Sequence, residues 1–164
     1  IYNKTNFPQI PLYILTILSN IYIVCVDKKS HQGLLYSGQR RLVWVDIFEK
    51  TFNWSKDLTY QPHDNEHGHQ NSTDLNVNVN VKNVSLDNVL KCNYVHSTED
   101  LNIPSCIVNI TIQTQPNSNT NTNTNHKVEL DSMQIICDSI TEGSDLYNAV
   151  MFTKGIKKLD RTTI

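Results

Sequence analysis

Glycine is scarce in this chain, and its five glycines do not fall at the spacing of a phosphate-binding loop. Such loops need closely spaced glycines, because backbone N–H groups must approach the anion. Charge is sparse as well: acidic and basic residues make up 18% of the chain and leave a net charge of −2. Nucleic-acid binding usually requires a clustered basic face. The sequence therefore argues against a P-loop or Rossmann site and against a nucleic-acid partner.

Motifs of catalysis and of metal binding are also missing. The chain has no Gly-x-Ser-x-Gly, His-Glu-x-x-His or Cys-x-x-Cys segment. These segments are typical of hydrolases, zinc proteases and metal or redox sites. We therefore assign no catalytic, cofactor-binding or metal-binding residue and no cofactor, and we expect a protein that is not an enzyme.

The four cysteines stand far apart, at positions 25, 92, 106 and 137. In a reducing compartment such residues behave as small apolar side chains. In a secreted protein, Cys92 and Cys106 could form a disulfide between neighbouring strands. Four free thiols require fewer assumptions, so this interpretation favours a cytoplasmic location over a secretory one.

What the chain has instead is regular alternation of apolar and polar residues, which is typical of strands with one buried face. The clearest stretch, residues 74–85, places a leucine and four valines among polar residues. Strands are predicted at 75–81, at 89–95 with Leu90, Cys92 and Tyr94 inward, at 107–114 with Val108, Ile110 and Ile112 inward, and at 128–137 with Met133, Ile135 and Cys137 inward. A change of phase after Leu130 predicts a bulge near Asp131 and Ser132.

Two polar segments, 60–74 and 115–127, are expected to be low-complexity loops outside any core. The second contains residues 117–125, which are only Asn, Ser and Thr. This Asn-rich tract lies between two predicted strands, where a hairpin loop can lengthen at little cost in free energy.

The segment from Phe7 to Val26 contains no charged residue and is long enough to span a bilayer as a helix. It also contains Pro8 and Pro11 and many β-branched residues, which favour strands in soluble proteins. We expect two buried strands, at 13–18 and 21–26, with a turn at Ser19-Asn20. A membrane span and a core helix stay open as alternatives.

A second pair of strands is predicted at 34–36 and 42–48, joined by a turn at 37–40 that contains Gly38. Residues 42–48 are apolar on both faces, which indicates a strand that is covered on both sides. Trp44 is expected to be a core aromatic.

Residues 144–155 are the one good helix candidate, with Ser144 as N-cap and Gly155 at the end.

Seven or eight short strands with at most one short helix predict a mainly β fold, an antiparallel β-sandwich. The alternation in 77–85 and 90–94 resembles the core strands of Ig-like domains, which implies a domain that binds other proteins. We expect residues 1–164 to be a single domain of a longer chain.

Two groups of polar residues are candidate sites. His63, His67 and His69 with the intervening carboxylates could bind Zn²⁺ or Ni²⁺, but they lie in a Pro/Asn/Gly-rich stretch that is typical of a surface loop. Five Asn-x-Ser/Thr sequons begin at Asn3, Asn53, Asn71, Asn83 and Asn109. A chain with 20 asparagines yields about three such triplets by chance, so they do not establish glycosylation.

The segment Arg41-Leu-Val-Trp-Val-Asp46-Ile47 resembles the strand that opens a blade in gluconolactonase/senescence-marker β-propellers. The resemblance implies a divalent metal and lactone hydrolysis. In place of the metal-binding glutamate that this family has just upstream, the chain has His31-Gln32-Gly33. The sequence thus leads to two functional hypotheses: a non-enzymatic interaction or structural domain with a protein partner, or a fragment of a metal-dependent hydrolase.

Overall fold

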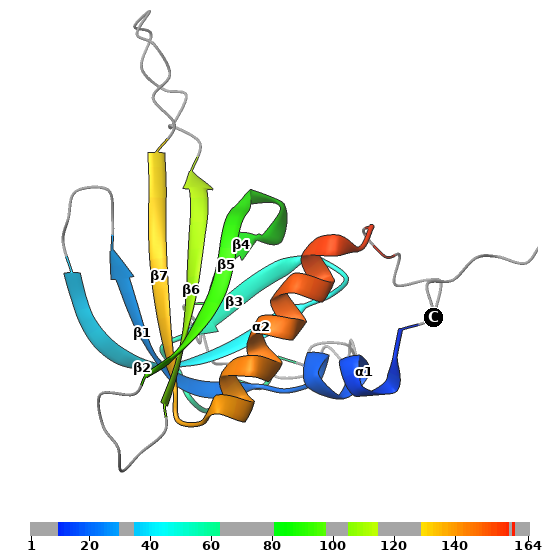
Figure 1. The fold of residues 1–164 in the computed structure, drawn as a ribbon, viewed down its shortest axis with the longest axis horizontal. Coiled ribbons are helices and arrows are strands. Elements are labelled where there is room, and N and C mark those ends of the chain that lie inside the picture. The colour runs from blue at the N-terminus through cyan, green and yellow to red at the C-terminus, as the bar shows by residue number, and fades with distance from the viewer. Residues whose placement is uncertain are drawn as a thin grey trace, which may run out of the picture.

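The computed structural model describes residues 10–29, 35–62, 81–97, 105–114, 129–157 and 159. Within them, seven strands form one antiparallel sheet: β1 (Tyr22–Lys29), β2 (Leu35–Asp46), β3 (Thr51–Ser55), β4 (Val81–Ser85), β5 (Val89–Ser97), β6 (Ser105–Thr114) and β7 (Glu129–Cys137). The order is β4-β3-β2-β1-β7-β6-β5, so β4 and β5 are the edges (Figure 1). The predicted mainly β, antiparallel fold is confirmed. The Ig-like sandwich is not confirmed, because these strands make a single open sheet.

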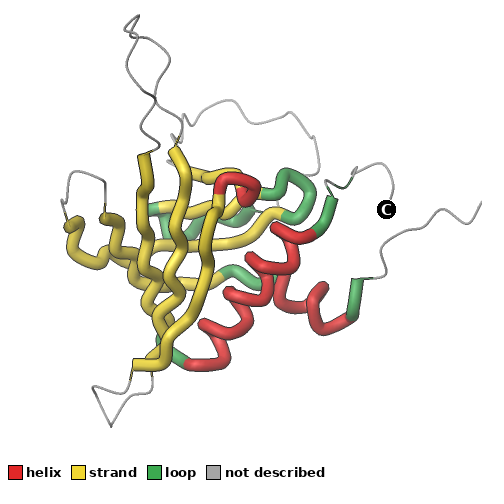
Figure 2. The backbone as a smooth tube through the Cα atoms, turned by 45° about the horizontal axis from the view of Figure 1, so that its top comes forward, coloured by secondary structure: helices red, strands yellow, loops and turns green. Residues whose placement is uncertain are grey.

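Two α-helices, α1 (Leu12–Leu18) and α2 (Ile140–Gly155), lie on the same side of the sheet (Figure 2). A short 3-10 helix, η2 (Leu86–Asn88), connects β4 to β5. The prediction of at most one short helix is therefore wrong. The core lies between α2 and the inner face of the sheet, and its largest fully buried side chains include Phe52, Leu86, Ile110, Met133, Ile135 and Leu146.

The predicted inner faces of β6 and β7 are confirmed. Val108, Ile110 and Ile112 are buried on β6, and Met133, Ile135 and Cys137 are buried on β7. The bulge expected near Asp131 and Ser132 is wrong, because the β6–β7 register runs without a shift from Cys106↔Cys137 to Thr114↔Glu129. Leu130, the second residue of β7, is an exposed apolar residue on the outer face of the sheet.

The apolar opening of the chain differs from the expectation at its first element. Residues 12–18 form α1 and not a strand, whereas the expected strand at 21–26 is confirmed as part of β1. Ile14, Ile17 and Leu18 are buried at helical spacing, so tertiary packing outweighs the strand preference of β-branched residues. Residues 7–9 lie outside the described residues. No helix among the described residues is long and apolar enough to span a membrane.

β2 is one continuous strand, so the predicted turn at residues 37–40 is wrong. The register with β1 passes from Val26↔Gln39 to Lys28↔Tyr36, which leaves Ser37 and Gly38 opposite a single residue of β1. Glycine inside a strand often marks such a bulge. Gly38 therefore bends a long strand instead of ending it. Further along β2, both faces are buried, as predicted from the apolar run.

α2 begins four residues earlier than the predicted helix. Ser139 is its N-cap, and its Oγ accepts a hydrogen bond of 3.1 Å from the backbone N–H of Glu142. Glu142 in turn accepts from the backbone N–H of Asp138, at 3.0 Å. Ser-x-x-Glu is the capping-box pattern, and it was present in the sequence at 139–142. The predicted end at Gly155 is confirmed.

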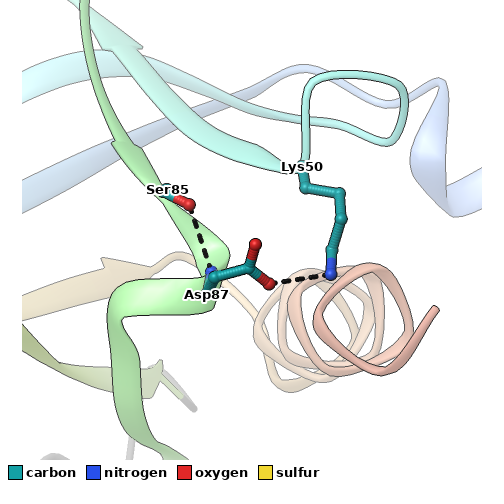
Figure 3. A network of polar contacts seen from close by, with 3 residues as sticks. All are labelled: Lys50, Ser85 and Asp87. Atoms are coloured by element: carbon teal, nitrogen blue, oxygen red, sulfur yellow. Dashed lines mark hydrogen bonds and ion pairs between the residues drawn. The ribbon is translucent and has the colours of Figure 1, made fainter. Parts of the chain in front are cut away.

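Lys50 joins the β2–β3 turn to η2 (Figure 3). It has φ 53°, the left-handed region that favours glycine. Its backbone oxygen accepts from Leu86 N–H at 2.8 Å, and its Nζ donates to Asp87 Oδ1 at 2.8 Å. The Oγ of Ser85 caps η2 by accepting from the N–H of Asp87. These contacts fix the crossover from β4 to β5, and so the start of the sheet edge at β5.

Candidate interaction surface

The two edges of the sheet differ in length and in chemistry. β4 has five residues, and its exposed side chains are Lys82 and Asn83. Short, charged edges discourage the addition of another strand. β5 has nine residues and pairs only with β6, so its other edge carries backbone groups without a strand partner among the described residues. Of the two edges in the described sheet, β5 is therefore the longer one.

Apolar side chains remain exposed along β5. The exposed fractions are 52% for Leu90, 39% for Tyr94 and 54% for Val95. Leu90 was predicted to face inward, and this is wrong: a register shift between Val89 and Lys91 turns it outward, while Val89 is buried. Lys91 and His96 are the charged or titratable side chains exposed on the same strand. The exposed side chains of β5 therefore include both apolar and polar groups.

An aromatic cluster connects β5 to α2. The ring of Tyr94 lies 4.9 Å from that of Tyr147 on α2, with an interplanar angle of 56°, and 5.6 Å from that of His96. Tilted aromatic pairs at such distances attract one another through their quadrupoles. Met151 is exposed one helical turn after Tyr147. We call Leu90, Tyr94, Val95, Tyr147 and Met151 the β5 surface.

Cys92 faces the same side of the sheet as Tyr94, and it is half-buried. Burial raises the pKa of its thiol to about 12, although the charge of Lys154 acts in the opposite direction. The thiolate, not the thiol, is the nucleophile in cysteine chemistry. At neutral pH the side chain is therefore a neutral apolar group, and its role at the β5 surface is packing.

The outer face of β5, β6 and β7 continues the β5 surface with two cross-strand rows. One row is apolar and runs from Val95 through Ile107 and Ile136 to Cys25 on β1. The next consists of amides: Asn93, Asn109 and Gln134. The Oδ1 of Asn93 is buried and has no hydrogen-bond partner in the described part of the chain. An extended chain at β5 would thus meet apolar and amide groups on the outer side.

The histidines considered as metal ligands, His63, His67 and His69, lie outside the described residues. Within the described ranges, no group of three or more His, Cys, Asp or Glu side chains could hold a metal ion. The sheet does not place Cys92 beside Cys106: Cys92 is opposite Ile110. All four cysteines are free thiols in the structure.

The segment that resembles a propeller blade lies in β2. Trp44 is buried as predicted, but it lies on the outer face, and its ring is 5.4 Å from that of Tyr60. The carboxylate of Asp46 accepts from the N–H groups of Phe48 and Glu49, at 2.9 Å each. Trp44 thus has an aromatic partner in the segment after β3, and Asp46 has hydrogen-bond partners in the β2–β3 turn.

Three of the five sequons lie on described strands. Asn53 is buried and donates from Nδ2 to Thr51, so it is not available for glycosylation in the folded chain. Asn83 is exposed on β4, and Asn109 is half-buried on β6. Asn3 and Asn71 lie outside the described residues.

Comparisons with known proteins do not add a family. No family model matches the chain, and no curated protein matches it. Sequence reasoning did not find the β5 surface as such. It placed Cys92 and Tyr94 on a common face, but the side chains of Tyr147 and Met151 come from a helix about fifty residues later in the sequence, and only the fold brings them together.

Proposed function

We propose that this chain is a non-enzymatic interaction domain and that it binds an extended segment of a protein partner along β5. The observation that carries the proposal is the nine-residue edge of β5, which has no strand partner among the described residues, beside the exposed Tyr94 and the half-buried Tyr147. In place of the two facing sheets of an Ig-like sandwich, the interaction would use one sheet edge and the helix beside it.

Strand addition explains how both parts of the β5 surface would act. The main chain of the partner would hydrogen-bond to the free edge, which provides affinity with little dependence on sequence. Alternate side chains of an added strand point to opposite faces. One set would contact Tyr94, Tyr147 and Met151, and the other set would contact Val95 and the outer face. The expected ligand is therefore an extended peptide with apolar or aromatic residues at alternating positions.

Peptide selection tests this proposal directly. Peptides selected from a displayed library on the purified domain should share an alternating apolar pattern. Titration calorimetry should show at least about a tenfold loss of affinity for the Tyr94→Ala variant, because truncating an aromatic hot-spot residue costs about 2 kcal/mol or more. Lys82→Ala on β4 is the matched edge control and should bind normally. Peptides that bind Tyr94→Ala and wild type equally would contradict the proposal.

The second candidate function is a metal-dependent hydrolase of the lactonase type. What favours it is the resemblance of 41–47 to a propeller strand and the group of His63, His67 and His69. Metal analysis of the purified chain distinguishes the two functions. A stoichiometric divalent ion, together with lactone hydrolysis that a chelator abolishes, would support the hydrolase and contradict a purely binding role.

A further inference from the structure

Cys106 and Cys137 are direct partners in the β6–β7 ladder, although they are thirty-one positions apart in the sequence. Both belong to the inner, helix-facing side of the sheet, and both side chains have an exposed fraction of 0%. The sequence had suggested a different pair, Cys92 with Cys106. The register of β5 and β6 separates those two, because it places His96 opposite Cys106.

The backbone spacing at this position suits a disulfide. Directly opposed residues in an antiparallel pair have Cα atoms about 4.5–5.5 Å apart, and disulfides form across about 4.4–6.8 Å. The other two cysteines have no such neighbour: Cys25 is opposite Ile136 and Arg40, and Cys92 is opposite Ile110. Cys25 also faces the outer side of the sheet. The fold thus brings together one pair out of six possible pairs.

Gly143, in the first turn of α2, makes room for the side chain of Cys106. A Cβ atom built there would lie 2.6 Å from Cβ of Cys106 and 3.7 Å from Cβ of Cys137, and it would also collide with the Sγ of Cys106. Real Cβ atoms essentially never approach another atom within 3.0 Å, so the contact with Cys106 excludes a larger residue at 143, whereas the distance to Cys137 is an ordinary contact. Cys106 therefore packs closely against the start of α2, and because both cysteines are fully buried, neither can react with a second protein molecule while the chain is folded.

We propose that Cys106 and Cys137 form a disulfide site: an oxidised low-molecular-weight disulfide of the glutathione class converts the two thiols into one cross-strand disulfide, and Cys25 and Cys92 stay reduced. This inference is independent of the function proposed for the β5 surface. It adds a covalent link between β6 and β7, next to the strand that forms that surface.

The reaction balances as two thiol–disulfide exchanges. The thiolate of one cysteine attacks the glutathione disulfide, forms a mixed disulfide and releases one glutathione. The thiolate of the second cysteine then attacks the protein sulfur of the mixed disulfide and releases the second glutathione. The cysteine pair loses two electrons and two protons in total, and the oxidant becomes two molecules of reduced thiol.

Burial of the two thiols limits the conditions under which this exchange can occur. Burial raises the pKa of the Cys106 thiol and raises the pKa of Cys137 to about 12. The thiolate needed for attack is therefore scarce in the folded chain. We expect oxidation while the chain folds, or when the end of the β6–β7 hairpin opens beneath α2. Once formed, the disulfide would be sheltered by the same packing.

Refolding and disulfide mapping test the proposal. The full chain is unfolded in denaturant and refolded once with reduced glutathione alone and once with a mixture of reduced and oxidised glutathione. Free thiols are then alkylated, and peptides are mapped without reduction. The expected result is a single Cys106–Cys137 disulfide in the oxidised sample, with Cys25 and Cys92 alkylated. The melting temperature should be higher than that of the reduced sample by at least about 5 °C.

Two variants check the assignment. The double variant Cys25→Ser/Cys92→Ser should form the same disulfide and gain the same thermal shift. Cys137→Val, which keeps an apolar side chain of similar size, should lose both. A Cys92–Cys106 disulfide, glutathione adducts without a protein disulfide, or four alkylated thiols in the folded wild-type chain after oxidative refolding would each overturn the proposal.

Discussion

Lys50 lies in a turn, but its side chain is buried and contributes to the stability of the fold. Its side chain is almost fully buried, with 11% exposed, whereas that of its partner Asp87 is 67% exposed. A buried ammonium that loses its acceptor costs more than an exposed carboxylate that loses its donor. The interaction is therefore asymmetric, and removing the acceptor is the more informative change.

We predict that Asp87→Ala lowers the free energy of unfolding by about 1–2 kcal/mol, because it leaves the Lys50 ammonium without this partner. Asp138→Ala is the matched control. It breaks an exposed ion pair with Arg40 at 3.6 Å and should change stability by less than about 0.5 kcal/mol. Urea denaturation measures both changes. Equal effects of the two substitutions would show that burial of Lys50 adds nothing to its contact with Asp87.

Three groups with a pKa raised by full or partial burial predict how stability depends on alkaline pH. Burial raises the pKa of Tyr22 from 10.0 to about 12, and those of Cys92 and Cys137 from 9.0 to about 12. As pH rises, the unfolded chain therefore releases these protons before the folded chain does. The resulting stability is complete below about pH 9 and is lost as pH rises toward 12.

Tyr22→Phe should remove the tyrosine's part of that loss. Between pH 10 and 12 the free energy of unfolding should fall less steeply in the variant, by up to about 1.4 kcal/mol per pH unit. The variant also loses the 3.4 Å hydrogen bond from the Tyr22 hydroxyl to the Ile17 carbonyl. That loss would lower the free energy of unfolding equally at every pH and so would not change its slope against pH. Denaturation curves at several alkaline pH values give the slopes. Parallel curves for both proteins would contradict the prediction.

At the scale of elements, β6 lies between β7 and the edge strand β5, and α2 packs against it. Ile110 is fully buried among core residues, and its neighbour Asn109 lies half-buried on the outer face. Successive residues of a strand point to opposite faces, so adjacent substitutions report on the register.

Ile110→Asp should unfold the domain, because it places an unpaired charge in the core. Asn109→Asp should leave it folded, with a loss of less than about 1 kcal/mol, because the side chain at 109 faces outward. Circular dichroism and urea denaturation separate these outcomes. Similar stability of the two variants would show that the assignment of faces on β6 is wrong.

The strands were predictable where a single face is buried. In β6 and β7, alternation alone identified the inward residues, because burial on one face imposes a period of two. The same logic produced a false bulge at Asp131 and Ser132. The bulge was needed only if Leu130 faced inward, but Leu130 is exposed, and apolar residues also occur on exposed faces.

The helices were harder to predict, because the burial of a helix face depends on tertiary contacts as well as on local sequence. Residues 12–18 have the composition of a strand, and only contacts with α2 and the sheet make Ile14, Ile17 and Leu18 a buried helical stripe. In contrast, the sequence does contain the signal for the start of α2, because Ser139 and Glu142 form a capping pattern upstream of the predicted N-cap Ser144.

At the scale of the whole molecule, the Asn-rich tract separates two strands that nevertheless pair over their whole length. The predicted position of the tract, between two neighbouring strands, is confirmed, and the tract itself lies outside the described residues. The β5 surface could not be found from the sequence, because it depends on which strand becomes an edge and on where α2 crosses the sheet.

Deleting residues 117–125 should change the free energy of unfolding by less than about 1 kcal/mol, because the cost of closing a loop depends only weakly on its length. The β6–β7 pairing holds the two ends of the tract together in either protein. Thermal and urea denaturation of the deletion variant provide the measurement. A loss of several kcal/mol would mean that the tract packs against the domain.

The central claim is that β5 is the edge at which a partner strand adds. The most direct measurement is an NMR titration of the isotopically labelled domain with a peptide selected for binding, followed by intermolecular nuclear Overhauser effects. We predict contacts between the peptide backbone and β5 amides, contacts between peptide side chains and the rings of Tyr94 and Tyr147, and no change at β4. Contacts confined to β4, to α1 or to the outer face of β1 and β2 would contradict the account.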